Sequence, residues 1–182
     1  MSIQNGKITK KSEKALLTNH PAAFIINGNN NISEVIFMLK GMDKILTGDL
    51  LKILCDMGHG DELIIADTNF PADGIAKRLI RYPGIDGGRF LEAISPLFPL
   101  DPYVDNPTGV MELTDSDKAK GMPDPEVWAI YADILKKNDA TFTELGRIER
   151  QAFYERARNA YAVIQTGEER LYGNLLLRKG VV

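Results

Sequence analysis

The chain has 182 residues with a net charge of −3 at pH 7; 44% of them are hydrophobic and 26% are charged. This composition is typical of one globular domain, and it excludes a membrane span because no apolar run approaches the roughly 18 residues required. The acidic balance also argues against nucleic acid as a partner, and we expect no membrane partner. The single cysteine, Cys55, favours a reducing, cytoplasmic location, and its apolar neighbours predict a core position.

Residues 1–37 differ in character from the rest of the chain. Four lysines occur by residue 14, and a polar cluster at 27–31 follows the short apolar stretch 22–26. That stretch is too short for the core of a secretory signal, and the absence of arginine argues against a transit peptide. We interpret residues 1–37 as an N-terminal extension that is flexible, specific to one lineage, or upstream of a start at Met38. His20 within it is expected to be solvated.

From Met38 onward, over a domain spanning 38–182, short apolar strands alternate with amphipathic helices. Thr47 and Asp49 can cap a first helix, which Gly58 ends, and the apolar stretch after it is typical of a strand covered on both faces. The predicted helices cover 50–57, 88–98, 124–137 and 147–161, and the predicted strands cover 62–67, 162–167 and 174–180. Trp128 lies beside the apolar stripe of its helix, as a packing residue or an interface edge. The alternation predicts an α/β sandwich.

The segment 57–71, MGHGDELIIADTNFP, contains the first group of candidate site residues. The glycines beside His59 let a ligand approach the imidazole, and Asp67 ends the strand that His59 precedes. That strand spans roughly 20 Å if straight. Three arrangements stay open: the chain curls, Asp67 orients His59 through a loop, or the site is completed across a subunit boundary. As purely structural alternatives, His59 caps the preceding helix and Asp67 forms a turn.

A second group of candidate residues lies near the C-terminus. Arg150 and Tyr154 are four residues apart and share a helix face, whereas Glu155 and Arg156 are expected to face solvent or form ion pairs. Tyr172 and Asn174 flank a glycine in a tight turn, which backbone geometry alone can also explain. Hydroxyl and amide groups with one arginine and one histidine suit a neutral, polyhydroxylated ligand, whose C–H face an aromatic ring can cover.

These stretches, together with MLKG at 38–41 and TGEERLYGNLLLRKG at 166–180, resemble the L-fucose mutarotase and D-ribose pyranase family. The segment AFYERA at 152–157 is closer to the fucose branch. The resemblance covers 38–182 and implies a compact α/β/α sandwich, assembly into a homo-oligomer (a dimer, or a ring such as a decamer) with sugar sites near subunit contacts, and neither a metal nor an organic cofactor. It implies these site residues: His59, Asp67 and Tyr154 in catalysis, and Arg150, Tyr172 and Asn174 in substrate binding.

The sequence also departs from the fucose branch. Asn69 and Asp73 stand where histidines are common, and Gln151 replaces an aromatic residue. These departures leave the reaction type in place and the preferred sugar open.

The reaction that the resemblance implies is the interconversion of α and β anomers of a free monosaccharide, with L-fucose as the first expected substrate and the pyranose and furanose forms of D-ribose as a further one. Imidazole suits proton transfer near neutral pH, so we expect His59 to act as acid and base, with Tyr154 or Tyr172 as its proton partner. Asp67 would fix the imidazole or bind a hydroxyl, and Arg150 and Asn174 would hold hydroxyls.

Three alternatives to this enzyme remain. One is a non-catalytic monosaccharide-binding accessory to sugar transport, and another is a ring-forming structural protein. The third is a metal-assisted isomerase, which is weaker because His59 with Asp61, Glu62 and Asp67 matches no recognised ligand spacing.

Overall fold

The computed structural model describes residues 24–26, 32–34 and 39–182. The chain divides into two units, residues 1–38 and 39–182. In the first, β1 (Phe24–Ile26) and β2 (Ile32–Glu34) pair as antiparallel strands. The rest of the expected extension, His20 included, lies outside the described residues. The following paragraphs concern the second unit by itself.

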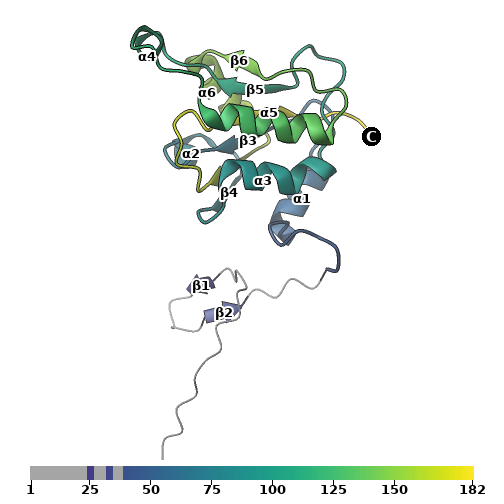
Figure 1. The fold of residues 1–182 in the computed structure, drawn as a ribbon. Coiled ribbons are helices and arrows are strands. Elements are labelled where there is room, and N and C mark those ends of the chain that lie inside the picture. Colours follow the sequence, from purple (N-terminus) through teal and green to yellow (C-terminus); the bar gives the residue numbers. More distant parts are fainter. Residues whose placement is uncertain (1–23, 27–31, 35–38) are drawn as a thin grey trace, which may run out of the picture. The chain divides into compact units, whose positions relative to one another are not determined.

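A six-stranded mixed sheet forms the centre of the second unit, in the order β4-β7-β3-β8-β5-β6 (Figure 1). Its strands are β3 (Glu62–Ala66), β4 (Leu79–Tyr82), β5 (Thr108–Met111), β6 (Gly146–Ile148), β7 (Ala162–Thr166) and β8 (Leu175–Arg178). β4, β7 and β3 are parallel to one another, as are β5 and β6, whereas β8 runs antiparallel to both of its neighbours. The beginning of β8 therefore lies beside the end of β3.

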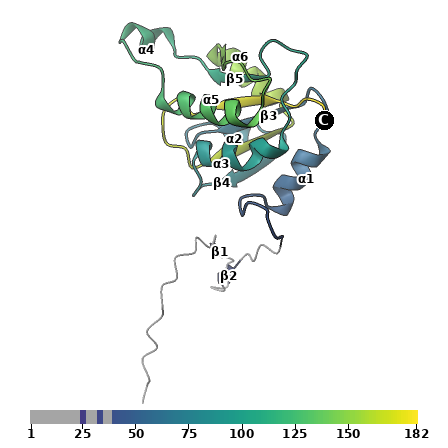
Figure 2. The same ribbon diagram turned by 45° about the vertical axis from the view of Figure 1, so that its right-hand side comes forward.

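Helices cover both faces of this sheet (Figures 1 and 2). One layer contains α1 (Gly48–Asp56), α3 (Gly87–Ile94) and α5 (Glu126–Asn138), and the other contains α2 (Ala72–Ile75) and α6 (Arg150–Asn159). The side chains of β3 alternate accordingly, with Leu63 and Ile65 in the first core and Ile64 and Ala66 in the second. The predicted α/β/α sandwich is confirmed.

A short helix, α4 (Asp115–Ala119), lies outside these layers, in an excursion of the chain away from the sheet (Figures 1 and 2). Thr114 caps it by accepting a hydrogen bond from the backbone N–H of Asp117. None of its residues is buried. Among the residues described, no helix is both long and apolar enough to cross a membrane.

The predicted helices and strands are all present, with shifted ends. Thr47 caps α1 as expected, but Gly58 does not end it in a left-handed conformation; Gly60 has the positive φ instead, at +84°. The helix predicted over 88–98 ends at Ile94 and tightens into a 3₁₀ turn over Ser95–Leu97, which buries Phe98 and leaves Leu97 exposed.

The remaining differences have local causes. The helix predicted from residue 124 begins at Glu126, with Pro125 as its N-cap, and the Asp124 carboxylate pairs with Arg147 instead. Residues 146–148 form a strand, so the next helix begins only at Arg150. Cys55 is exposed, so its predicted core position is wrong. Trp128 packs in the core, so of its two expected roles the packing role is confirmed.

Candidate active site

A hollow of about 240 Å³ opens where β3 ends and β8 begins. Such a volume lies just below the roughly 300–1,000 Å³ of pockets for drug-sized ligands, which suits a single sugar ring. Five of the six residues expected in the site line it: Asp67, Arg150, Tyr154, Tyr172 and Asn174. The other lining residues are Asn69, Phe70, Met111, Asp117 and Leu171.

Asp67 is the buried carboxyl group of this hollow. The side-chain amide of Asn174 donates to its Oδ2 at 2.7 Å, and the backbone N–H of Asn69 donates to its Oδ1 at 3.0 Å. The latter bond closes the turn that was one expected role of Asp67. Burial raises the pKa of Asp67, although these donors oppose the shift. Because no cation pairs with it among the described residues, the carboxyl group binds a proton more readily than an exposed one.

Asn174 positions Asp67 through both ends of its amide. Besides donating to the carboxylate, its Oδ1 accepts the backbone N–H of Asp67 at 3.0 Å. The antiparallel register of β3 and β8, in which Ile65 faces Leu175, brings the two residues together across 107 positions of sequence. The pair therefore fixes the end of one strand to the start of the other.

Arg150 and Tyr154 reach the hollow from the first turn and a half of α6. The carboxylate of Glu149 caps this helix by accepting the backbone N–H groups of residues 151 and 152, which fixes where the helix begins. The Arg150 guanidinium carbon lies 5.8 Å from the centre of the Tyr154 ring. Phe70 packs against that ring at a centroid distance of 5.6 Å. The predicted shared face of Arg150 and Tyr154 is confirmed.

Tyr172 reaches the hollow from a strained position of the backbone. Its φ of +60° lies in the left-handed region, which is unusual for a residue with a bulky side chain. Gly173 is required by space: a Cβ there would lie 2.6 Å from Cγ of Glu168. The indole N–H of Trp128 donates to the carbonyl of Tyr172 at 2.9 Å, and the Tyr131 hydroxyl donates to that of Gly173 at 2.8 Å.

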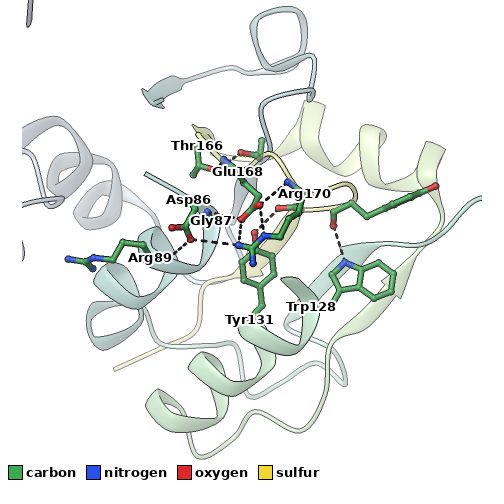
Figure 3. Close-up of polar contacts among 11 residues, drawn as sticks. Asp86, Gly87, Arg89, Trp128, Tyr131, Thr166, Glu168 and Arg170 are labelled. Carbon is green, nitrogen blue, oxygen red and sulfur yellow. Dashed lines mark hydrogen bonds and ion pairs between the residues drawn. The ribbon is translucent and has the colours of Figure 1, made fainter. Parts of the chain in front are cut away.

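Polar contacts of Glu168 and Arg170 hold the loop 167–174, which carries Tyr172, in place (Figure 3). The buried Glu168 carboxylate accepts the backbone N–H of Gly87 at 3.2 Å and two N–H groups of the Arg170 side chain. Burial alone would raise the pKa of Glu168, but the Arg170 guanidinium and the backbone donors hold it below its ordinary value. The carboxylate is therefore a structural anchor for residues 167–174.

His59 lies at the opposite end of β3. Its Nε2 is 3.1 Å from Oδ1 of Asp101, its ring meets the exposed Tyr103 ring edge-on at 5.6 Å, and its side chain is 46% exposed. Asp101 is buried and also accepts the Arg178 guanidinium at 2.8 Å. The hydrogen bond from Arg178, followed by that from the Tyr103 N–H, lowers the pKa of Asp101 to about 2.

This placement decides between the alternatives for His59. β3 is extended and Asp67 bonds to Asn174, so neither a curled chain nor an Asp67 that orients His59 is correct. The capping alternative is also wrong, because the Lys179 ammonium donates to the carbonyls of residues 54 and 57 at the end of α1. Completion of the site across a subunit boundary stays a prediction.

The carboxylates considered for a metal do not converge. Asp61 accepts the backbone N–H of Gly58, and Glu62 pairs with Arg156, both at the amino end of β3 and away from Asp67. The expected ion-pair role of Arg156 is confirmed. Of the positions that depart from the fucose branch, Asn69 lines the hollow, whereas Asp73 is exposed and pairs with Arg81.

Two carboxylates that the sequence analysis missed are Asp117, which lines the hollow, and Asp101, which binds His59. Asp117 lies in an acidic and basic stretch typical of a solvated surface, and Asp101 lies 42 residues from His59. The only local sequence signal at Asp101 is the turn motif DPY at 101–103.

Comparison with known proteins places this site in a family. The model of the RbsD / FucU transport protein family matches residues 40–182. The human protein named fucose mutarotase is 49% identical over 147 residues, covering 79% of this chain and 94% of that one. The L-fucose mutarotase of Actinobacillus pleuropneumoniae serotype 5b is 44% identical over 144 residues, covering 79% and 97%.

Solved structures agree with these relatives. The fucose mutarotase of Streptococcus pneumoniae in complex with L-fucose superposes with a TM-score of 0.71 at 39% identity, covering 79% of this chain and 99% of that one. Bacillus subtilis RbsD complexed with D-ribose gives a TM-score of 0.58 at 25% identity, covering 80% and 99%. The chain therefore belongs to the RbsD / FucU family.

Proposed function

We propose that this protein is an L-fucose mutarotase that also accepts D-ribose, interconverting the α and β anomers of the free sugar. The observation that carries the proposal is the buried Asp67 carboxyl group, whose pKa is raised and which faces a hollow lined by Arg150 and two tyrosines. Relatives named fucose mutarotase, at 44–49% identity over most of the chain, support the same reaction.

The chemistry requires one base and one acid on the same sugar. The base takes the proton of the anomeric hydroxyl while the acid protonates the ring oxygen, so that the bond between C1 and the ring oxygen breaks and an aldehyde forms. Rotation of the C1 carbonyl and the reverse proton transfers close the ring to the other anomer, with no net change in atoms. We assign proton transfer within one chain to Asp67 and Tyr154, and sugar hydroxyl binding to Arg150 and Tyr172.

His59 completes the proposed site from a second copy of the chain. In its own chain it lies beyond the far end of β3, yet it is half exposed and held by the buried Asp101. An exposed and oriented imidazole at a surface suits a group that acts on a neighbour's substrate. The protein is accordingly a homo-oligomer in which the partner subunit's His59 faces the hollow, and the free thiol of Cys55 fits a cytoplasmic location.

Exchange NMR on L-fucose and D-ribose tests the proposal directly. Purified protein is expected to accelerate the exchange between anomeric proton signals, and Asp67→Asn is expected to abolish the acceleration. Asp73→Asn is the matched control, because Asp73 is an exposed aspartate close in sequence that does not line the hollow. Sugar binding without acceleration would instead identify a non-catalytic accessory to transport, and the proposal would then be wrong.

A further inference from the structure

The hydroxyl group of Tyr172 is held between two groups of the α4 excursion. The backbone N–H of Thr114 donates to it at 3.2 Å, and it donates its own proton to Oδ2 of Asp117 at 2.6 Å. The direction of the second bond is unambiguous, because an ionised carboxylate can only accept. The phenol of Tyr172 therefore has a fixed proton position.

The hydrogen-bond donors around the Asp117 side chain stabilise its ionised form. Its carboxylate also accepts the Thr114 hydroxyl at 3.0 Å and the Lys120 ammonium at 3.1 Å. The Tyr172 hydroxyl, then Lys120 and Thr114, lower the pKa of Asp117 to about 2. Near neutral pH the carboxylate therefore keeps its charge and accepts the phenolic proton in a hydrogen bond.

Two further contacts fix the ring that carries this hydroxyl. Trp128 meets the Tyr172 ring edge-on at a centroid distance of 6.5 Å, and its indole N–H binds the Tyr172 carbonyl. Together with the two hydrogen bonds of the hydroxyl group, they hold the phenol toward Thr114 and Asp117, and Asp117 lines the hollow. With its proton given to Asp117, the phenolic oxygen can offer a ligand only a lone pair.

We propose that Asp117 is a positioning residue that makes the Tyr172 phenol an acceptor for one substrate hydroxyl and keeps it from acting as the proton donor to the ring oxygen. This inference rests on the proposed mutarotase function and deepens it. It resolves the choice between the two tyrosines, since only Tyr154 is then left for proton transfer. It also gives α4 a function, because this excursion carries the group that sets substrate binding.

The test compares Asp117→Ala with Asp115→Ala on the same helix, by exchange NMR over a series of L-fucose concentrations. Asp115 is exposed and does not line the hollow, so its variant is the matched control. Loss of one charge-assisted hydrogen bond is expected to raise KM about five- to tenfold with kcat within about twofold. Asp117→Asn, which retains an acceptor oxygen, is expected to recover much of the wild-type KM.

A double-mutant cycle separates positioning from a general effect on structure. In a Tyr172→Phe background, Asp117→Ala and Asp117→Asn should cause no further rise in KM, because the group on which Asp117 acts is gone. The same rise in that background as in the wild type would overturn the inference, as would equal effects of the Asp117 and Asp115 variants, or a loss of kcat at constant KM.

The failure of the proposed function looks different from these outcomes. If the wild-type protein binds sugar but does not accelerate exchange, the mutarotase function itself is wrong. If the wild type exchanges anomers and Asp67→Asn does not, while Asp117→Ala keeps the wild-type KM, only the positioning role of Asp117 is wrong.

Discussion

The two ends of β3 each hold a buried aspartate, and the two carboxyl groups have opposite properties. At the amino end, Asp101 is paired with Arg178, and its pKa falls to about 2. At the carboxyl end, Asp67 has an amide and backbone N–H groups as hydrogen-bond donors, and burial raises its pKa. The same residue type thus has a lowered pKa at one end and a raised pKa at the other.

The different surroundings of Asp101 and Asp67 suit the two residues to different functions. The guanidinium makes Asp101 suitable for orienting a neighbour, and that neighbour is the half-exposed His59. Asp67, whose hydrogen-bond donors are all neutral, lines the hollow, whereas His59 lies beyond the other end of β3. Under the proposed function, these two residues would act on one sugar only if two copies of the chain meet.

The largest expected effect comes from removing the ionisable group of Asp67. Asp67→Asn should lower the rate of anomer exchange by about 10²–10⁴-fold, the usual range for general acid–base assistance. Exchange NMR at saturating L-fucose measures this rate. If the variant retains the wild-type rate, Asp67 has no catalytic role, and the two aspartates do not differ in function as proposed.

Mixing two inactive variants tests whether the two ends meet between copies. His59→Ala and Asp67→Asn should each be inactive alone. Unfolded together in equal amounts and refolded, they should recover about a quarter of the wild-type exchange rate, since a quarter of randomly formed sites take both intact residues. Mixing the separately folded proteins without exchange of subunits is the control. No recovery after joint refolding would confine each site to a single chain.

Substitutions of Tyr154 and Tyr172, the two tyrosines that line the hollow, should change different kinetic constants. Tyr154→Phe removes the proposed proton donor and should lower kcat about 10²-fold with little change in KM. Tyr172→Phe removes a hydroxyl that only accepts, so KM should rise about five- to tenfold. The dependence of exchange rate on sugar concentration gives both constants. The reverse pattern would assign the proton to Tyr172.

The smallest effect concerns stability at the amino end. The pKa of Asp101 is lowered in the folded protein, so its contribution to stability is present above the ordinary value of 3.8 and is lost as pH falls through about 2. Asp101→Asn should therefore be less stable than the wild type at pH 6 and lose less stability between pH 4.5 and 2.5. Urea unfolding midpoints at these pH values measure the change. Parallel pH profiles would contradict the ion-pair account.

The sequence predicts the long elements of this fold and misses the short ones, for a physical reason. β3 and α5 carry apolar runs long enough to show their period, and both are found where expected. β6 has three residues and β5 four, one of them a glycine that packs against Ile148, so neither contains a readable pattern. β5 pairs with β8, and β6 pairs with β5, so their strand conformation depends on contacts between distant segments that no local signal reports.

The residues of the candidate site likewise divide into those that local sequence patterns predict and those that only contacts reveal. Asp67, Arg150, Tyr154 and Asn174 occur in motifs whose spacing or strand-end position already indicates a shared ligand, and the structure brings them together. Asp117 and Asp101 act through partners 55 and 42 residues away, so their functions become visible only through contacts. The position of His59 follows from the extended length of β3, which the sequence does indicate.

The antiparallel strand β8 has a consequence for how the molecule is made. In the sheet order, β4-β7-β3 and β5-β6 are separate groups that only this strand joins, and it follows all five of these strands in the sequence. The two groups can therefore unite only once residues 175–178 pair between them. A change that prevents β8 from pairing is expected to separate two groups of strands from each other, and not to remove one strand alone.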